Sequence, residues 1–444
     1  MKVYEKIYSY YIKQMADGSL KPGDKMPSLR ESERMLSASR TSIETAYLQL
    51  AADGYIYSVE KVGYFVSETV NRYEGVLEET EVETNNKENN LGAARQMEYE
   101  YDLATLGEDR EVSCLQLWRR YMKSALRQED RLLSYSANQG EYDLRVEIAA
   151  HVRKSRNIIC GPEDIVVGAG FQNLLQILIA LIPGERTISF PTKDFSDGAM
   201  TFKNAGFQVS YRNKNCHVIY VTPSYMTKWG EVMTMKRRHE LIDHAKYDGH
   251  LIIEDDYQNE FVFSTKPTPS LYAMMGGENI AFLGSFSRVL LPSVRISYII
   301  LPRGLRDKYE AIKEYYNQTA SKAEQIALAQ FLRDGHLGRH IKKMKRLYEE
   351  KREIIRDAIE KNITFEHKYI LGESGMEIAL QINGIDNEKN YALKNIPVRV
   401  NLLDSAENSV ILLISCSKIP KEDIENSIKK LNEGLQDVFS MINY

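Results

Sequence analysis

Hydroxyl side chains and arginines gather in one short stretch of the chain, "GSFSRVLLPSVR", from Gly284 to Arg295. It closes one apolar run, "NIAFL", and leads into another, "ISYIIL", so we place it at a strand end. Ser285, Ser287 and Arg295 suit a phosphate group, because hydroxyl donors and a forked guanidinium match its oxygens. Arg288 adds a second fixed cation, whose role the spacing leaves open.

Two other polar groups lie next to apolar runs. Gly168-Ala169-Gly170 precede the helical pattern "FQNLLQILIALI", and the free N–H groups of a helix start bind phosphate. Small-residue turns of this kind are also common without any ligand. "EDDY", Glu254–Tyr257, ends an apolar strand. Its carboxylates could hold Mg²⁺, accept a proton from a ring nitrogen, or cap a turn, and the spacing alone favours the cap.

The elements that position these groups alternate between strands and helices from about Tyr101 onward. We expect strands at 164–168, 187–190, 217–222, 250–257, 279–287 and 294–302, with helices at 171–182, 197–205 and 236–246. Near-continuous apolar runs joined by helices predict an α/β fold, a parallel sheet with helices on both faces. Ligands bind such sheets at the carboxyl ends of the strands, where the polar groups collect. After Pro302, long charged helices and three apolar runs predict a smaller α+β domain within 303–444.

The first 70 residues have a different pattern. Apolar residues at helical spacing predict a helix from Val3, and Gly18 supplies its stop. Ser28 and Glu31 form a capping-box pattern before a second helix at 29–37. Thr41 and Glu44 repeat that pattern, and they are expected to open a third helix that ends before Gly54. A β-hairpin follows, with its turn at 61–63.

This order of elements is that of a winged helix-turn-helix, whose third helix can enter a DNA major groove. The start of the third helix offers Ser39, Arg40, Thr41 and Ser42, hydroxyls and a guanidinium that suit phosphates and base edges. Arg30 lies at the start of the second helix, another phosphate-friendly position. A solvated helix face is the alternative, because acids and bases nearly balance here and leave no broad basic footprint.

Composition excludes several classes of protein. The 444 residues have a net charge of −4, with 43% hydrophobic and 27% charged residues, as in ordinary globular proteins. The longest apolar stretch is too short to span a bilayer, and the charged N-terminus is not a secretory signal. The four cysteines have no metal-binding spacing, so we expect reduced thiols and a cytoplasmic location. Residues 71–100 are acidic and poor in apolar side chains, which predicts a flexible linker.

The N-terminal segment "KIYSYYIKQMADGSLKPGDKMPSLRESERMLSASRTSIETAYLQLAADGYIYSVEKVGYFV" closely resembles the GntR-type DNA-binding domain. The resemblance implies double-stranded DNA as a partner. It implies DNA contacts at Ser28, Arg30, Ser39, Arg40, Thr41, Ser42 and, in the wing, Lys61 and Gly63. Glu44 departs from relatives that place a cation there, which puts one phosphate contact in doubt.

The remainder resembles fold-type-I aminotransferases through "GEYDLRVEIAAHVRKSRNIIC", "DIVVGAGFQNLLQIL", "YVTPS", "IIEDDYQNEF" and "LGSFSRVLLPSVRISYIILP". With the winged helix in front, the whole chain resembles the MocR (GabR-like) subfamily of GntR regulators, which bind pyridoxal 5′-phosphate. That likeness implies three parts: a DNA-binding domain at 1–70, the linker at 71–100, and an aminotransferase-like domain at 101–444. The cofactor residues that it implies are Gly170 and Phe171 for phosphate, Asp255 for the pyridine nitrogen, Tyr257 for the phenolic oxygen, and Ser285, Ser287 and Arg295 for phosphate.

Several positions depart from the family pattern. Arg288 falls where the family has the lysine that holds the cofactor as an imine, and arginine cannot provide a neutral primary amine. Lys193 is nearest the position of the stacking tyrosine, with Phe195 two places on. "TPSYMTKWG" loses polar groups of the pocket, and Lys418 stands where an arginine would grip a substrate carboxylate. Covalent cofactor binding is therefore not expected, except through a displaced lysine such as Lys193.

We therefore expect a DNA-binding transcription regulator whose aminotransferase-like domain serves dimerisation and the sensing of a small anionic or phosphorylated effector, without catalysis. The resemblance implies a head-to-tail homodimer. The alternatives are an active pyridoxal-phosphate aminotransferase and a non-covalent sensor of another phosphorylated metabolite. Arg288 could pair with a second anion on a ligand or with Asp255 in an empty site, or it could form a relic salt bridge.

Overall fold

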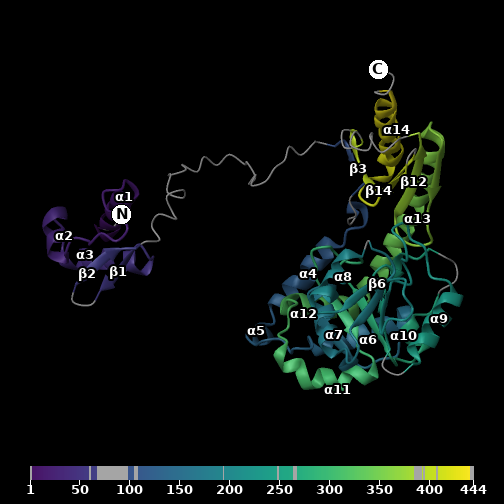
Figure 1. The fold of residues 1–444 in the computed structure, drawn as a ribbon, viewed down its shortest axis with the longest axis horizontal. Coiled ribbons are helices and arrows are strands. Elements are labelled where there is room, and N and C mark those ends of the chain that lie inside the picture. The colour runs from purple at the N-terminus through teal and green to yellow at the C-terminus, as the bar shows by residue number, and fades with distance from the viewer. Residues whose placement is uncertain are drawn as a thin grey trace. The chain divides into compact units, whose positions relative to one another are not determined.

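The computed structural model describes residues 3–59, 62–67, 99–104, 109–193, 195–247, 250–263, 268–384, 393, 396–406 and 409–440. The chain forms two compact units, Met1–Gln96 and Met97–Tyr444, which Figure 1 draws in purple and in blue to yellow. Of the predicted linker, only residues 99 and 100 belong to the described ranges.

The first unit is a winged helix. It contains three helices and a two-stranded antiparallel sheet: α1 (Val3–Ala16), α2 (Leu29–Leu36), α3 (Arg40–Ala52), β1 (Ile56–Val59) and β2 (Gly63–Val66). Its core includes a chain of hydroxyl groups, since Ser32 bonds both Tyr11 and Tyr47, at 2.7 and 2.8 Å. Tyr47 also donates to the carbonyl of Pro27 at 2.8 Å. This small core is therefore held by hydrogen bonds as well as by apolar contacts.

The capping predictions for α2 and α3 have different outcomes. Ser28 and Glu31 form the predicted capping box of α2, which is confirmed. The predicted start of α3 at Thr41 and Glu44 is wrong, because Ser39 is the N-cap and its hydroxyl accepts the N–H of Ser42 at 3.3 Å. Ser39 has the extended backbone that a cap requires, which places Thr41 inside the first turn.

The second unit is built on a seven-stranded sheet in the order β4-β10-β9-β8-β7-β5-β6. These strands are β4 (Ile165–Gly168), β5 (Thr187–Phe190), β6 (Gln208–Tyr211), β7 (Val218–Val221), β8 (Leu251–Asp255), β9 (Ile280–Ser285) and β10 (Ser297–Ile300). Alternate residues of β7 belong to two separate apolar clusters: Val218 and Tyr220 to one, Ile219 and Val221 to the other. The sheet is therefore buried on both faces, as continuous apolar strands predict.

Two features of this sheet differ from the prediction. β10 is antiparallel to both of its neighbours, because residues 286–296 return the chain directly without a crossover helix. The edge strand β6 was missed, since its half-exposed residues lack an apolar run. The other four neighbouring pairs follow the predicted parallel arrangement.

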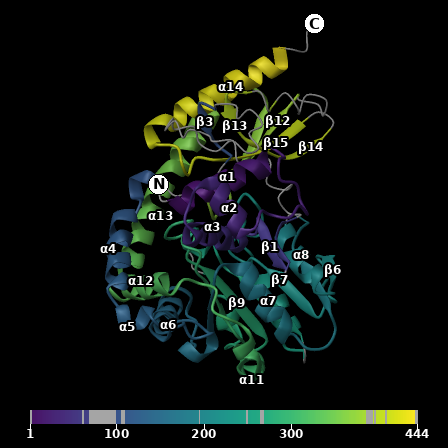
Figure 2. The ribbon, with the colours of Figure 1, turned by 90° about the vertical axis from the view of Figure 1, so that its left-hand side faces the viewer.

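Helices cover the sheet and form one flank of the unit. They are α4 (Leu115–Leu126), α5 (Glu129–Leu132), α6 (Tyr142–Arg156), α7 (Phe171–Leu181), α8 (Ser196–Asn204), α9 (Met235–Ala245), α10 (Leu271–Met274), α11 (Arg303–Ile312) and α12 (Lys322–Arg333). Figure 2 shows α4 and α12 side by side on that flank, next to the long helix α13 (His336–Asn362). No helix within the described ranges is both long and apolar enough to cross a membrane.

A small antiparallel sheet, in the order β11-β12-β15-β14, forms the predicted smaller domain. Its strands are β11 (His367–Ile370), β12 (Glu377–Asn383), β14 (Asn401–Ala406) and β15 (Ser409–Ser415), and α14 (Ile424–Ser440) packs with α13 beside it. The short strand β3 (Tyr101–Asp102) pairs in parallel with β13 (Val398–Arg399). Strand pairing thus joins the first described residues of the unit to a strand near its C-terminal end.

Candidate functional site

The first candidate site is the exposed N-terminal turn of α3. Arg40 and Thr41 are exposed there, and Ser39 and Ser42 share a hydrogen bond of 2.9 Å between their hydroxyls. Because Ser39 also caps the helix, Arg40 and Thr41 are the members of this group with the greatest freedom to approach DNA. The structure therefore brings all four predicted residues to one turn.

The other predicted DNA contacts lie around this turn or outside the described residues. Ser28 and Arg30 are exposed at the start of α2. Gly63 opens β2 with a φ of +130°, a conformation that favours glycine, and lies beside the Lys25 side chain. Lys61 lies outside the described residues. Glu44, the departure from the family pattern, is exposed on α3.

The second candidate site is a cavity of about 470 Å³ in the second unit. The carboxyl ends of β8 and β9 contribute Asp255 and Ser285, and the loop after β9 contributes Ser287, Arg288 and Arg295. The small domain closes it with residues 375–377 and Ser417. A cavity of this size, at the strand ends of an α/β sheet, is of the kind that holds a cofactor or metabolite.

One end of the cavity is a cup for an anion. Gly170 precedes α7 with a φ of +95°, and a Cβ on it would meet the Arg295 guanidinium at 3.0 Å. Arg295 therefore lies directly against the helix N-terminus, where free N–H groups favour negative charge. Ser285 accepts hydrogen bonds from the N–H of Ser287 at 3.3 Å and from the Ser297 hydroxyl at 3.0 Å. The predicted phosphate residues are thus assembled, and Phe171 lines the same end.

The floor of the cavity holds a buried acid. Asp255 accepts a short hydrogen bond from the hydroxyl of Tyr220, on the neighbouring strand. Burial raises the pKa of Asp255 to about 7, although the hydrogen bond from Tyr220 opposes that rise. Phe195 packs against Tyr220, with 4.6 Å between the ring centroids, and it lines the cavity beside Tyr257. Asp255 is therefore an acid that a cationic ring nitrogen could keep ionised.

The other acids of "EDDY" face away from the cavity. Glu254 accepts the N–H groups of Leu271 and Tyr272, both at 2.9 Å, and so caps α10. Burial, and then the charge of Asp256, raise the pKa of Glu254 to about 7. Asp256 pairs with Arg156 at 2.6 Å. In the described ranges no three His, Cys, Asp or Glu side chains are arranged to hold a metal ion.

Arg288 has a partner that sequence reasoning missed. Its guanidinium lies 3.3 Å from the carboxylate of Glu377, the first residue of β12. The suggested pairing of Arg288 with Asp255 is wrong, because Tyr220 occupies Asp255 while Glu377 lies closer to the guanidinium. The sequence signal for Glu377 was an acid at the start of an apolar run, "EIALQI", because an acid next to a buried strand needs a polar partner.

Two other predicted positions are not in the cavity. Lys418 is exposed, and its neighbour Ser417 lines the cavity instead. The turn after β15 buries Cys416 and Ile419, which leaves Lys418 pointing outward. Lys193 is also exposed and is not one of the described lining residues, whereas Phe195 is. The prediction that Lys418 binds a substrate carboxylate is therefore wrong, because the structure does not bring this side chain to the site.

The cavity fits pyridoxal 5′-phosphate at two of its three functional ends. The close approach of Arg295 to Gly170 makes a phosphate cup, and Asp255 is a buried carboxylate suited to a pyridine nitrogen. Arg288 also lines the cavity, and the family resemblance would place it at the aldehyde end. The residues present therefore suit the phosphate and the ring.

Comparison with known proteins agrees with the division of the chain into two units. A model of the gntR family of bacterial regulatory proteins matches residues 3–66, and one of aminotransferase class I and II matches residues 106–403. YdeL of Bacillus subtilis (strain 168), an uncharacterized HTH-type transcriptional regulator, is 31% identical over 97% of this chain and 96% of its own length. PdxR of Corynebacterium glutamicum, a pyridoxine biosynthesis transcriptional regulator, is 29% identical over 78% of this chain and 76% of its own.

Solved structures extend the comparison to the fold of the second unit. An archaeal alanine:glyoxylate aminotransferase superposes with a TM-score of 0.65 at 21% identity, covering 77% of this chain and 92% of its own. The two units thus define a DNA-binding transcription regulator that carries an aminotransferase-like domain. The chain belongs to the aminotransferase class I and II family and, with YdeL, to the HTH-type transcriptional regulators; its N-terminal domain is of the gntR type, and its homologues include the regulators MocR, PdxR and TauR. The predicted fold and regulator class are confirmed, and the family implies DNA binding, a pyridoxal 5′-phosphate site and dimerisation.

Proposed function

We propose that the aminotransferase-like domain of this regulator is a non-covalent sensor of a phosphorylated effector and not a catalyst. The observation that carries this proposal is a permanently charged side chain in the cavity, Arg288, which pairs with Glu377. The family resemblance would place Arg288 at the position of the imine-forming amine. A transaminase needs that amine twice, first as a nucleophile and then as a base for the α-proton. This chain offers neither function at Arg288.

Pyridoxal 5′-phosphate is the first candidate for the effector. Gly170, Phe171, Ser285, Ser287 and Arg295 would hold its phosphate, Asp255 its ring nitrogen, and Tyr257 its phenolic oxygen. When bound, this group supplies a dianionic phosphate, a cationic ring and an aldehyde. The Arg288–Glu377 pair favours a second candidate, another phosphorylated metabolite held without any covalent bond, because the pair gives the cavity charges that an aldehyde does not use.

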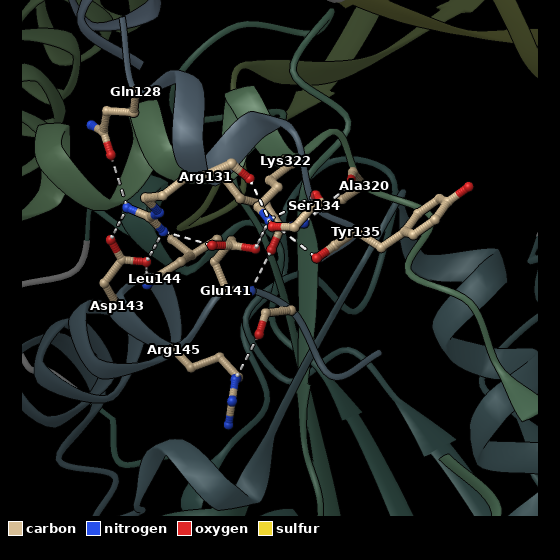
Figure 3. Close-up of polar contacts among 12 residues, drawn as sticks. Gln128, Arg131, Ser134, Tyr135, Glu141, Asp143, Leu144, Arg145, Ala320 and Lys322 are labelled. Atoms are coloured by element: carbon tan, nitrogen blue, oxygen red, sulfur yellow. Dashed lines mark hydrogen bonds and ion pairs between the residues drawn. The ribbon is translucent and has the colours of Figure 1, made fainter. Parts of the chain in front are cut away.

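Dimerisation through the second unit would present two α3 helices to paired DNA half-sites. Leu126, Leu133, Tyr135 and Tyr142 are exposed apolar or aromatic side chains between the end of α4 and the start of α6. Ion pairs fix this segment: Figure 3 shows Arg131 between Glu141, at 2.6 Å, and Asp143, at 3.0 Å. An exposed apolar surface on a fixed backbone is typical of a protein interface.

Figure 3 also shows Lys322 bonding the carbonyls of Ser134 and Tyr135, while the Tyr135 ring points away from the network. We infer that this surface joins two copies of the chain head to tail in the cytoplasm. Leu133→Glu should convert dimer to monomer in size-exclusion chromatography with light scattering. Ile370→Glu, which changes an exposed apolar residue of the small sheet, is the matched control. A Leu133→Glu dimer of unchanged stability would exclude this face.

The experiment that tests the sensor proposal is a spectrum of the purified chain with pyridoxal 5′-phosphate, before and after borohydride, followed by intact mass. We expect saturable binding without a borohydride-trapped adduct. An adduct that maps to one lysine, or turnover of any pair of amino acid and keto acid, would overturn the proposal. Ligand-dependent change in affinity for operator DNA would then establish sensing, because an effector must bind two states of the regulator unequally.

A further inference from the structure

The ion pair between Arg288 and Glu377 is long and leaves the acid with unused capacity. Its 3.3 Å separation exceeds the 2.7–2.9 Å that is usual, roughly, for a charge-assisted hydrogen bond. The side chain of Glu377 is 3% exposed and that of Arg288 is 30% exposed. The second carboxylate oxygen of Glu377 accepts the N–H of Met376 at 2.8 Å. The first oxygen can therefore take a stronger donor from a ligand, because a carboxylate accepts several hydrogen bonds.

The charges that line the described cavity also call for a cation. They comprise two arginines, Arg288 and Arg295, and three carboxylates, Asp197, Asp255 and Glu377. A phosphate group on Arg295 adds nearly two negative charges near neutral pH. Away from the phosphate, Arg288 then faces Glu377, while Asp255 lies at the floor and Asp197 at the exposed rim. A ligand that carries positive charge away from its phosphate restores the balance, whereas a further anion would lie beside Glu377.

Among the described residues, Arg288 is the cation that pairs with Glu377, and the other polar groups near this acid have further partners of their own. Arg352 lies near, but its guanidinium donates to the carbonyls of Gly372 and Gly375 and packs over the Phe263 ring. Tyr225 donates its hydroxyl hydrogen to the carbonyl of Lys228 at 2.5 Å, and this hydroxyl also lies within hydrogen-bonding reach of the Glu377 carboxylate. Burial, and then the charge of Glu377, raise the pKa of Tyr225, so this phenol stays neutral. Arg288 is thus the cation that a ligand must compete with.

We propose that the cavity selects a phosphate ester whose other end carries a primary ammonium group, bound by Glu377, over the matching aldehyde or alcohol. This selection rests on the proposed function as a non-covalent sensor. On a cationic heteroaromatic ring, the chemistry is that of pyridoxamine 5′-phosphate. The three charged ends of such a ligand would meet Arg295, Asp255 and Glu377 in turn.

The displaced Arg288 has a place to go. Both Arg288 and Glu377 also line a second cavity of about 430 Å³, together with Tyr257 and Asn401. The guanidinium can turn into that space when an ammonium takes its partner. Because Arg288 belongs to the large sheet's loop and Glu377 to the small sheet, such an exchange would alter the contact between these two parts of the unit.

Isothermal titration of the full chain at pH 7.5 with pyridoxamine, pyridoxine and pyridoxal 5′-phosphates tests the proposal. The alcohol is the clean neutral comparison, because it cannot react with surface lysines. We expect the amine to bind about tenfold more tightly than the alcohol, or more, since hydrogen bonds to charged groups are the stronger ones. Glu377→Gln should remove most of this preference and leave the affinity for the alcohol unchanged. Asp197→Asn, at the exposed rim of the cavity, is the matched control and should keep it.

Arg288→Gln is the second variant, and it should raise the affinity for the amine, whereas Glu377→Gln should lower it. Arg288→Gln frees Glu377 from its internal partner, so affinity for the amine should rise several-fold. Equal binding of amine and alcohol, or a preference that persists in Glu377→Gln, would overturn the amine selection while the sensor proposal stands. If none of the three compounds binds, the amine selection is overturned, and the sensor proposal keeps only its second candidate, another phosphorylated metabolite.

Discussion

Tyr220 donates its hydroxyl hydrogen to Asp255, from β7 to the neighbouring strand β8, at the floor of the cavity. Both side chains are buried, so the carboxylate is stabilised by a neutral hydroxyl and not by a fixed cation. The ion pair that a sequence pattern would assign to Asp255 is absent from its described surroundings, where Arg288 reaches Glu377. Asp255 is therefore an acid whose charge depends on pH and on what occupies the cavity.

Asp255→Asn should stabilise the ligand-free protein at high pH. The pKa of Asp255 is raised to about 7, so the folded state favours the protonated form. Stability from this group is complete below its unfolded pKa of about 4 and is lost as pH rises through 7. The variant avoids that loss, which at pH 8 is on the order of 4 kcal/mol, because each pKa unit corresponds to about 1.36 kcal/mol. Urea unfolding at pH 5 and pH 8 measures it.

The control for this experiment is Asp197→Asn, which removes an exposed acid near the same cavity. It should show no difference between the two pH values beyond that of the unaltered chain. An Asp255→Asn protein that is less stable than the parent at pH 8 would mean that the carboxylate is ionised and well paired in the free protein. Adding the phosphorylated effector should reverse the order of the two proteins, because the ring nitrogen then needs the charged acid.

Gly170→Ala should weaken binding of phosphate compounds to the cavity. Its φ of +95° already disfavours a side chain, and the new Cβ would push the Arg295 guanidinium out of the cup. Gly206→Ala is a matched control, since Gly206 has a φ of +84° but no atom within 4 Å of the Cβ position. Both variants should lose about 1 kcal/mol of stability, and only Gly170→Ala should lose roughly tenfold in affinity. If Gly170→Ala and Gly206→Ala bind phosphate compounds with equal affinity in titrations, Arg295 does not contribute to phosphate binding.

Much of the fold follows from local patterns. The apolar runs at 218–221 and 251–255 are buried on both sides, so their composition alone identifies central strands. The edge strand β6 has no such signal, because its residues are exposed or only half-buried and include few apolar side chains. The reversed direction of β10 depends on how residues 286–296 return, a tertiary property that strand composition does not encode.

The cavity could be predicted only in part for a related reason. Ser285, Ser287 and Arg295 are close in sequence, so one turn positions them and the spacing reveals them. Glu377 reaches the cavity from a different sheet, 89 residues from Arg288, and Tyr220 reaches Asp255 from a neighbouring strand. Contacts of that range depend on how the sheets pack. Lys418 was predicted to reach the cavity, but its side chain faces solvent, and the preceding residue, Ser417, lines the cavity instead.

Arg40→Ala should weaken binding to specific operator DNA. Arg40 is exposed in the first turn of α3, and an arginine that reads a base contributes about 1–3 kcal/mol of discrimination. Arg34→Ala removes another exposed arginine, from the last turn of α2, and is the matched control with little expected loss. Electrophoretic shifts with specific and random DNA at two salt concentrations measure both effects. If Arg40→Ala loses the same affinity for specific DNA as for random DNA, Arg40 contacts phosphate and not a base.

Ser32→Ala should destabilise the winged helix from within, although Ser32 cannot contact DNA. The hydroxyl is fully buried and joins Tyr11 to Tyr47 by two hydrogen bonds, at 2.7 and 2.8 Å. Its removal leaves the buried Tyr11 hydroxyl without this partner, which costs about 1–3 kcal/mol. Tyr47 keeps its bond to the Pro27 carbonyl, so the loss should concentrate on the packing of α1 against α2.

Hydrogen exchange of the full chain, followed by mass spectrometry of peptides from residues 3–59, measures this loss as faster exchange in α1 and α2. Ser9→Ala is the control on α1, because the exposed Ser9 hydroxyl only donates to the carbonyl of Glu5, one turn earlier, at 2.9 Å. Only the folded domain binds the operator, so the apparent affinity of Ser32→Ala should fall as the folded fraction falls. Cooling toward the temperature of maximum stability should restore that affinity. Unchanged exchange in Ser32→Ala would show that apolar packing alone holds the three helices together.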